Sequence, residues 1–129
     1  MKLISYMRMG KPHFGALVDG GIVNLTGVLP GKPRTLKSAI AKGVLREVPA
    51  YVADRKAELA SDDITFLPTI SDPAKILCVG LNYAKHQAET GRPDTDHPTI
   101  FTRYADSQVG HLQPMIKPLQ SERFDYEGE

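Results

Sequence analysis

Hydrophobic and polar residues alternate along the first 25 positions of the chain. The stretches LISYMRM and HFGALVDGGIVNL have the period of two that is typical of β-strands with one buried face. Asp19-Gly20-Gly21 interrupts the second stretch, and glycine accepts the positive φ angles that tight hairpin turns require. We therefore expect antiparallel strands joined at this turn. Their core positions would be Leu17, Val18, Ile22 and Val23.

The stretch TLKSAIAKG changes to the spacing of a helix. Leu36, Ala39 and Ile40 fall on one helical stripe, which predicts that all three face the core. Thr35 suits the N-cap, and Gly43 suits the end of the helix.

A second helix is predicted to begin near Pro49, because proline fits the first turn of a helix, and to run to about Leu59. Its apolar side would carry Val52, Ala53 and Ala60. A short strand is expected in the next stretch, SDDITFLPTISDPAK, which has turn signals on both sides.

The character of the chain changes at Lys75. The continuous apolar run ILCVG favours a strand buried on both faces. A short helix should follow, with Asn82 as its cap and Gly91 at its end. The polar stretch RPDTDHP predicts a surface loop. Beyond it, TIFTRYA, MIKPL and FDYEGE have strand character.

These elements predict an α+β fold in two parts, divided near residues 68–74. Residues 1–70 would form a small α+β module whose core also includes Leu36, Ile40 and Val52. Residues 71–129 would form the opening part of a second domain that the chain contains incompletely.

Composition narrows the class of protein. The 129 residues are 41% hydrophobic and 24% charged, as in globular proteins, and no apolar run reaches the roughly 20 residues of a membrane helix. The first residues lack the pattern of a signal peptide. Cys78, the single cysteine, cannot form an internal disulfide and is expected to be a small buried hydrophobe. We therefore expect a cytoplasmic protein with no membrane partner.

Charge is divided unevenly along the chain. Residues 1–60 carry ten Lys and Arg against four Asp and Glu, whereas residues 61–129 carry six against eleven. The basic residues are scattered and are not clustered with aromatic ones, which argues against a nucleic-acid partner. A divalent cation would be expected in the acidic half.

Two pairs of side chains have a spacing that catalysis uses. His86 and Glu89 lie three residues apart on the predicted short helix, and a carboxylate beside an imidazole raises its basicity, as in a general base. Glu127 and Glu129 point to one face of a strand, where they suit a hard cation such as Mg²⁺ or Mn²⁺. Spacing alone leaves the alternatives open, because surface helices and solvent-facing strand edges carry the same patterns by chance.

Four motifs, taken in order, resemble the start of the catalytic domain of the fumarylacetoacetate hydrolase family. KILCVGLNYAKHQAETG contains V-G-x-N-Y at the end of a strand and H-x-x-E on a helix. PTIFTRYADSQVG contains F-x-[KR], and IKPLQSERFDYEGE ends in D-Y-E-G-E. The resemblance covers about residues 74–129, and the segment ahead of it looks like the variable leading domain of that family.

The resemblance implies a mixed β-roll that binds Mg²⁺ or Mn²⁺. By position in the motifs, Glu127 and Glu129 would be metal ligands, and His86 and Glu89 would activate water from a helix that acts as a lid. Arg103 would lie near the carboxylate of the substrate. The third metal ligand, an Asp, would lie beyond Glu129, so the chain resembles the front part of a longer enzyme.

The implied activity is metal-dependent hydrolysis of a carbon–carbon bond in a β-diketo acid or acylpyruvate, in the catabolism of aromatic compounds, by a homodimer. Related keto-acid decarboxylases and isomerases remain alternatives. Another alternative is a non-catalytic fragment that self-associates through unpaired strand edges. Residues 1–129 alone are expected to be inactive, because two carboxylates at a free chain end hold Mg²⁺ poorly.

Overall fold

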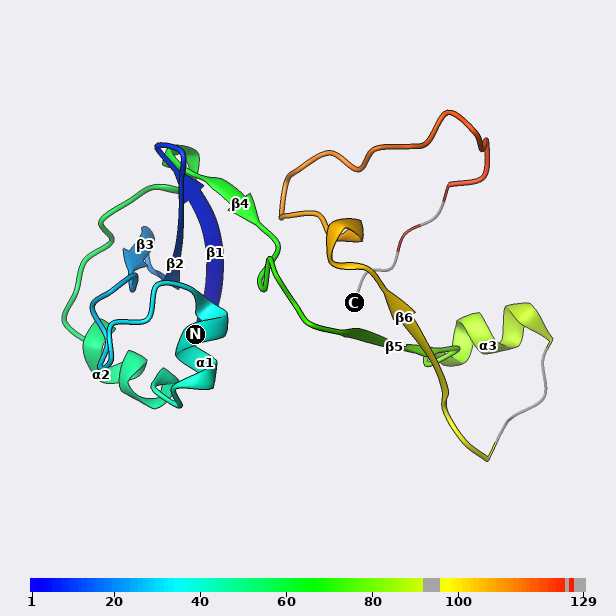
Figure 1. Ribbon diagram of the computed structural model, residues 1–129, viewed down its shortest axis with the longest axis horizontal. Helices are drawn as coiled ribbons and strands as arrows, with labels where there is room; N and C mark the ends of the chain where they lie inside the picture. The colour runs from blue at the N-terminus through cyan, green and yellow to red at the C-terminus, as the bar shows by residue number, and fades with distance from the viewer. Residues whose placement is uncertain (92–95, 125, 127–129) are drawn as a thin grey trace.

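The computed structural model describes residues 1–91, 96–124 and 126, which form two sheets joined by an extended connection (Figure 1). The four-stranded sheet has the order β3-β2-β1-β4, and the two-stranded sheet consists of β5 and β6. The strands are β1 (Lys2–Arg8), β2 (Lys11–Val18), β3 (Gly21–Asn24), β4 (Thr65–Leu67), β5 (Ile76–Gly80) and β6 (Thr99–Arg103). The α-helices are α1 (Leu36–Ala41), α2 (Val48–Val52) and α3 (Ala84–Thr90), and short 3-10 helices are η1 (Leu45–Glu47), η2 (Ser61–Asp63) and η3 (Ala105–Ser107).

Tight turns build the larger sheet. Met9 and Gly10 both have positive φ, +47° and +72°, in the two-residue turn between β1 and β2. Val18 pairs with Gly21 across the next turn, where Gly20 has a φ of +86°, so the predicted hairpin is confirmed. The short β4, which was expected within residues 61–75, pairs antiparallel with β1 and forms the edge of the sheet.

Two clusters of buried side chains hold this sheet. The smaller cluster joins Tyr6 and Ile22 to Leu59. The larger one joins β2 and the segment after β3 to α1 and α2, through Phe14, Ala16, Leu25, Leu29, Leu36, Ala39 and Val48. Of the predicted core residues, Ile22, Val23 and Leu36 are buried, Leu17, Val18 and Val52 are half-buried, and Ile40 is exposed.

Thr35 caps α1 as predicted. The Ser38 backbone N–H donates to Thr35 Oγ1 (3.1 Å), and the Thr35 N–H donates to Ser38 Oγ (3.1 Å), which satisfies two amides at the helix start. Gly43 follows the helix with a φ of +66°, as expected. The predicted burial of Ile40 is wrong: its exposed fraction is 52%, because it lies at the flank of the stripe that Leu36 and Ala39 bury.

The second helix is shorter than predicted. Pro49 lies at its start, as expected, but α2 ends at Val52 and does not run to Leu59. The chain then becomes extended, and Ile22 donates its N–H to the carbonyl of Leu59 (2.8 Å) while Glu58 donates to the carbonyl of Ile22 (2.8 Å). These long-range contacts bury Leu59 and leave Ala53 and Ala60 exposed, so pairing with β3 overrides the helical pattern.

The second sheet is an antiparallel hairpin. Cys78 is buried opposite Phe101, as predicted, but the exposed fraction of Leu77 is 64%, so β5 is not buried on both faces by the described residues. Tyr83, and not Asn82, is the N-cap residue of α3, and Gly91 ends this helix with a φ of +61°. The prediction of a strand at MIKPL is wrong, because the segment pairs with no strand among the described residues and Ile116 is 89% exposed.

The chain is therefore α+β, as the sequence predicts. Its two sheets lie on either side of residues 68–75, and the division into domains at residue 70 stays a prediction. Within the described ranges, no helix combines the length and apolar character that a membrane crossing requires.

Candidate functional site

The helix α3 carries the predicted catalytic pair. Its seven residues include positions 86 and 89, which share one helix face because they are three residues apart. Glu89 is exposed. The side chain of His86 lies outside the described part of the structure, so contact between His86 and Glu89 stays a prediction.

Arg103 lies at the end of the hairpin that is opposite α3. It pairs with Ile76, the first residue of β5, whereas Gly80, which leads toward α3, pairs with Thr99. Since β5 has five residues and a strand rises by about 3.4 Å per residue, the two ends are about 14 Å apart. The guanidinium carbon of Arg103 lies 4.6 Å from the centre of the Phe101 ring. The hairpin therefore does not bring Arg103 and α3 together.

The predicted metal ligands Glu127 and Glu129 lie outside the described residues. Among the residues that the structure describes, no group of three His, Cys, Asp or Glu side chains has the arrangement to hold a metal ion. The chemistry of the E-x-E pair still fits a hard cation, because two carboxylates supply the oxygen ligands that Mg²⁺ and Mn²⁺ prefer. The metal site stays a prediction from the sequence.

The connection from β5 to α3 contains a strained backbone. Leu81 has a φ of +58°, in the left-handed region where a Cβ atom clashes with the backbone, and it is half-buried. With Gly91 at the other end, α3 is bounded on both sides by left-handed residues. Such strain is frequent next to functional segments.

Replacement by glycine usually destabilises a protein more than replacement by alanine, but the strain at Leu81 predicts the opposite order there. Leu81→Gly should be more stable than Leu81→Ala by about 1 kcal/mol, because only glycine adopts positive φ without cost. Thermal unfolding of both variants measures the difference. A more stable alanine variant would show that residue 81 has an ordinary φ.

A polar cavity on the larger sheet involves residues to which the sequence assigns no role. Its volume is about 160 Å³, and Tyr6, Arg8, His13, Asn24, Glu58 and Leu59 line it. The Tyr6 hydroxyl donates to Asn24 Oδ1 (3.0 Å), and the Tyr6 ring stacks on His13 with 5.5 Å between ring centres. Burial, aided by the nearby Glu58, raises the pKa of Tyr6 to about 12, while Arg8 opposes the shift. Tyr6 and His13 meet through the pairing of β1 with β2, and Glu58 and Leu59 reach the cavity through their hydrogen bonds with Ile22.

Burial lowers the pKa of His13 from its ordinary value of 6.5, and the positive charges of Arg8, Arg34 and Lys11 act in the same direction. His13 Nδ1 is buried and accepts or donates no hydrogen bond among the described residues. The folded protein therefore disfavours the protonated imidazole.

This shift predicts how stability depends on pH. The unfolded chain binds more protons at His13 than the folded chain, so the free energy of unfolding should fall as the pH drops below about 6.5. His13→Gln should remove this part of the pH dependence, and His97→Gln, in the exposed segment before β6, is the matched control. Urea titrations at several pH values measure the slopes. Equal slopes for wild type and His13→Gln would contradict the assignment.

The second part of the chain matches a known family profile. Residues 75–129 match the profile described as fumarylacetoacetate (FAA) hydrolase C-terminal. From Lys75 onward, the chain belongs to the fumarylacetoacetate hydrolase family. The resemblance predicted from the four motifs is confirmed, over almost the same residues.

Relatives of the fumarylacetoacetate hydrolase family extend the similarity to the whole chain. The chain is 31% identical to the mitochondrial oxaloacetate tautomerase FAHD2A of Bos taurus, with 100% of this chain and 43% of the relative covered. It is 33% identical to the human FAHD2A, with coverages of 92% and 39%. An uncharacterised protein of Archaeoglobus fulgidus is 41% identical over 66 residues, which are 51% of this chain and 26% of that protein. The chain thus spans less than half the length of these relatives.

Proposed function

We propose that this chain is part of a fumarylacetoacetate hydrolase-family enzyme that catalyses keto–enol tautomerisation of a small keto acid of the oxaloacetate type. The main support for the proposal is that proteins named oxaloacetate tautomerases align with 92–100% of the chain, at 31–33% identity. This reaction class replaces hydrolysis as the first candidate, because the relatives that align with most of the chain are named tautomerases.

The proposed tautomerisation needs a group that moves a proton between carbon and oxygen. In the direction from keto to enol, a base removes a proton from C3 of the acid and a proton is delivered to the C2 oxygen. His86 would be this base, because an imidazole exchanges protons near neutral pH. Glu89, on the same face of α3, would hold the imidazole in its reactive orientation.

A divalent metal fits this proposal. Glu127 and Glu129 would contribute two of its oxygen ligands, and the bound metal would supply charge stabilisation to the enolate oxygen. The third ligand, the β-roll that surrounds the site and a homodimeric assembly are further parts of the proposal. These parts rest on family resemblance alone. Cytoplasmic location is also part of the proposal and rests on the single cysteine and on the character of the first residues; the named relatives are described as mitochondrial.

Hydrolysis of an acylpyruvate is the second candidate, and the description of the matching profile as a hydrolase domain favours it. Both reactions pass through an enolate, so the same residues serve either one. They differ in whether water enters: hydrolysis breaks a carbon–carbon bond and adds one water, whereas tautomerisation leaves the composition of the acid unchanged.

Product analysis separates the two candidates. Full-length protein with Mg²⁺ should interconvert the keto and enol forms of oxaloacetate and should leave acetylpyruvate intact. Nuclear magnetic resonance (NMR) detects both outcomes, since hydrolysis of acetylpyruvate yields acetate and pyruvate. Rapid formation of these two acids, without acceleration of oxaloacetate enolisation, would favour the hydrolase instead. A non-catalytic role would give neither reaction.

A further inference from the structure

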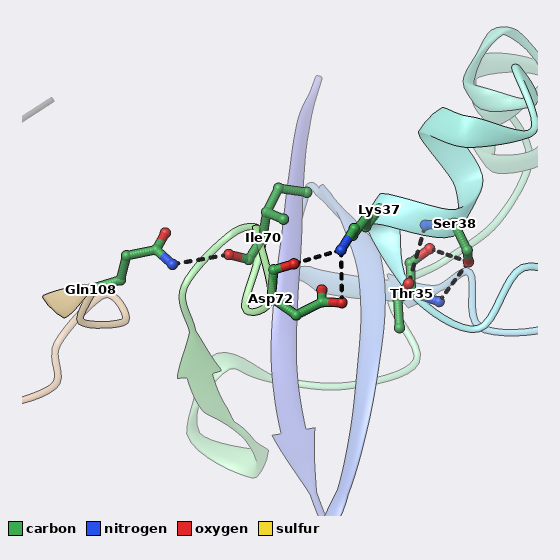
Figure 2. Close-up of polar contacts among 6 residues, drawn as sticks. All are labelled: Thr35, Lys37, Ser38, Ile70, Asp72 and Gln108. Carbon is green, nitrogen blue, oxygen red and sulfur yellow. Dashed lines mark hydrogen bonds and ion pairs between the residues drawn. The ribbon is translucent and has the colours of Figure 1, made fainter. Parts of the chain in front are cut away.

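The turn that connects the two sheets is held by side chains from three different elements. Ser5 Oγ of β1 donates to the carbonyl of Thr69 (2.7 Å), and Gln108 Nε2, just after η3, donates to the carbonyl of Ile70 (3.2 Å). From α1, Lys37 Nζ donates to the carbonyl of Asp72 (2.5 Å) and to its carboxylate (3.0 Å). Figure 2 shows Lys37 and Gln108 approaching this turn from opposite sides. Three backbone carbonyls within four residues are thus fixed by partners distant in the sequence.

The segment that leaves the hairpin lies against the same region. We name residues 105–113 the strap. Gly110 in the strap is buried, and a Cβ atom added there would lie only 2.2 Å from the carbonyl oxygen of Phe66 in β4. The ring of His111 meets the ring of Phe66 edge-on, with 5.0 Å between centres. The strap therefore covers part of β4, the edge strand of the larger sheet, where an exposed edge invites pairing with another chain.

These contacts anchor both chain connections at one end of the hairpin. The turn at 69–72 leads into β5, and the strap follows β6 directly. A cavity of about 220 Å³ borders the turn, lined by Leu36, Leu67 and Ile70 among others, while Ile70 also packs against the larger core cluster. Hydrogen bonds and the packing of Ile70 together hold the turn in place. The Lys37–Asp72 ion pair is exposed and contributes little. The main attachments are then the hydrogen bonds from Ser5 and Gln108 and the close approach of Gly110.

We propose that the strap and the side chains that donate to the turn (Ser5, Lys37 and Gln108) form a clamp. This clamp makes the larger sheet and the β5–β6 hairpin one rigid body. Residues 68–75 are then not a hinge, although their position between two sheets suggests one. Motion is confined to the far end of the hairpin, where α3 lies between the left-handed residues Leu81 and Gly91. The proposal concerns mechanics alone and does not depend on the reaction that the enzyme catalyses.

Two variants of the full chain test the clamp. Gly110→Val forces the strap away from Phe66, and Gln108→Glu replaces the amide donor by an acceptor that repels the carbonyl of Ile70. Gln120→Glu makes the same chemical change at an exposed position and is the matched control. NMR reports docking through the ring-current shift of His111, while the shift of His13, stacked on Tyr6, reports whether the larger sheet is intact.

Residual dipolar couplings measure the relative orientation of the two sheets. In wild type and Gln120→Glu, amides of β1–β3 and of β5–β6 should fit a single alignment tensor, and His111 should show its shift. In Gly110→Val and Gln108→Glu, the His111 shift and the common tensor should both be lost while the His13 shift persists. Separate tensors in the wild-type chain would overturn the proposal. A variant that loses the His111 shift but still fits a single alignment tensor would also overturn the proposal.

Discussion

Replacing His86 with alanine in the full-length enzyme should lower kcat by roughly 10²- to 10⁴-fold, the usual contribution of a general acid–base group. His86 is the proposed proton carrier, and the sequence of α3 contains no second histidine that could replace it. Metal affinity should change little, because the proposed ligands lie elsewhere in the chain. Steady-state kinetics and a calorimetric metal titration measure both quantities.

Matched variants on the same helix sharpen this test. Glu89→Gln should lower kcat less than His86→Ala does, since it removes the group that orients the imidazole and not the imidazole itself. Lys85→Ala changes an exposed neighbour and should leave turnover close to wild type. If His86→Ala retained wild-type turnover, the role of His86 would be refuted.

The second large effect concerns α1. Leu36→Ala should lower the free energy of unfolding by about 2–5 kcal/mol, because it removes a buried side chain, only 4% exposed, from the main core cluster. Ile40→Ala, one turn later on the same helix, should change it by less than about 0.5 kcal/mol. Both substitutions introduce alanine into α1, so helix propensity contributes little to the difference in the free energy of unfolding.

Urea unfolding followed by circular dichroism measures this contrast. Similar losses for Leu36→Ala and Ile40→Ala would mean that α1 is rotated relative to the orientation described above. The sequence pattern alone predicts similar losses, since it assigns both residues to the buried stripe.

Features that depend on a few neighbouring residues could be predicted from the sequence. The turn at Asp19-Gly20 follows from the positive φ that glycine accepts, and the cap at Thr35 follows from a hydroxyl that bonds an amide three residues away. Features that depend on distant partners could not. The chain leaves the helix after Val52 because Glu58 and Leu59 pair with Ile22, and no local pattern contains that information.

The same distinction between local and distant features applies to the candidate site. The spacing of His86 and Glu89 places them on one face of α3 without knowledge of the fold. The position of Arg103 relative to them is set by the register of β5 and β6, which pairs Arg103 with Ile76 at the opposite end. The clamp on the turn at 69–72 was likewise beyond the sequence, since Ser5, Lys37 and Gln108 converge only through tertiary structure.

The most direct test of the proposed function is the rate at which the full-length protein with Mg²⁺ converts the enol of oxaloacetate into its keto form. The proposed tautomerase should give a saturable acceleration over buffer that chelation of the metal abolishes and that His86→Ala reduces by roughly 10²- to 10⁴-fold. An enol that ketonises at the same rate with and without the protein would contradict it.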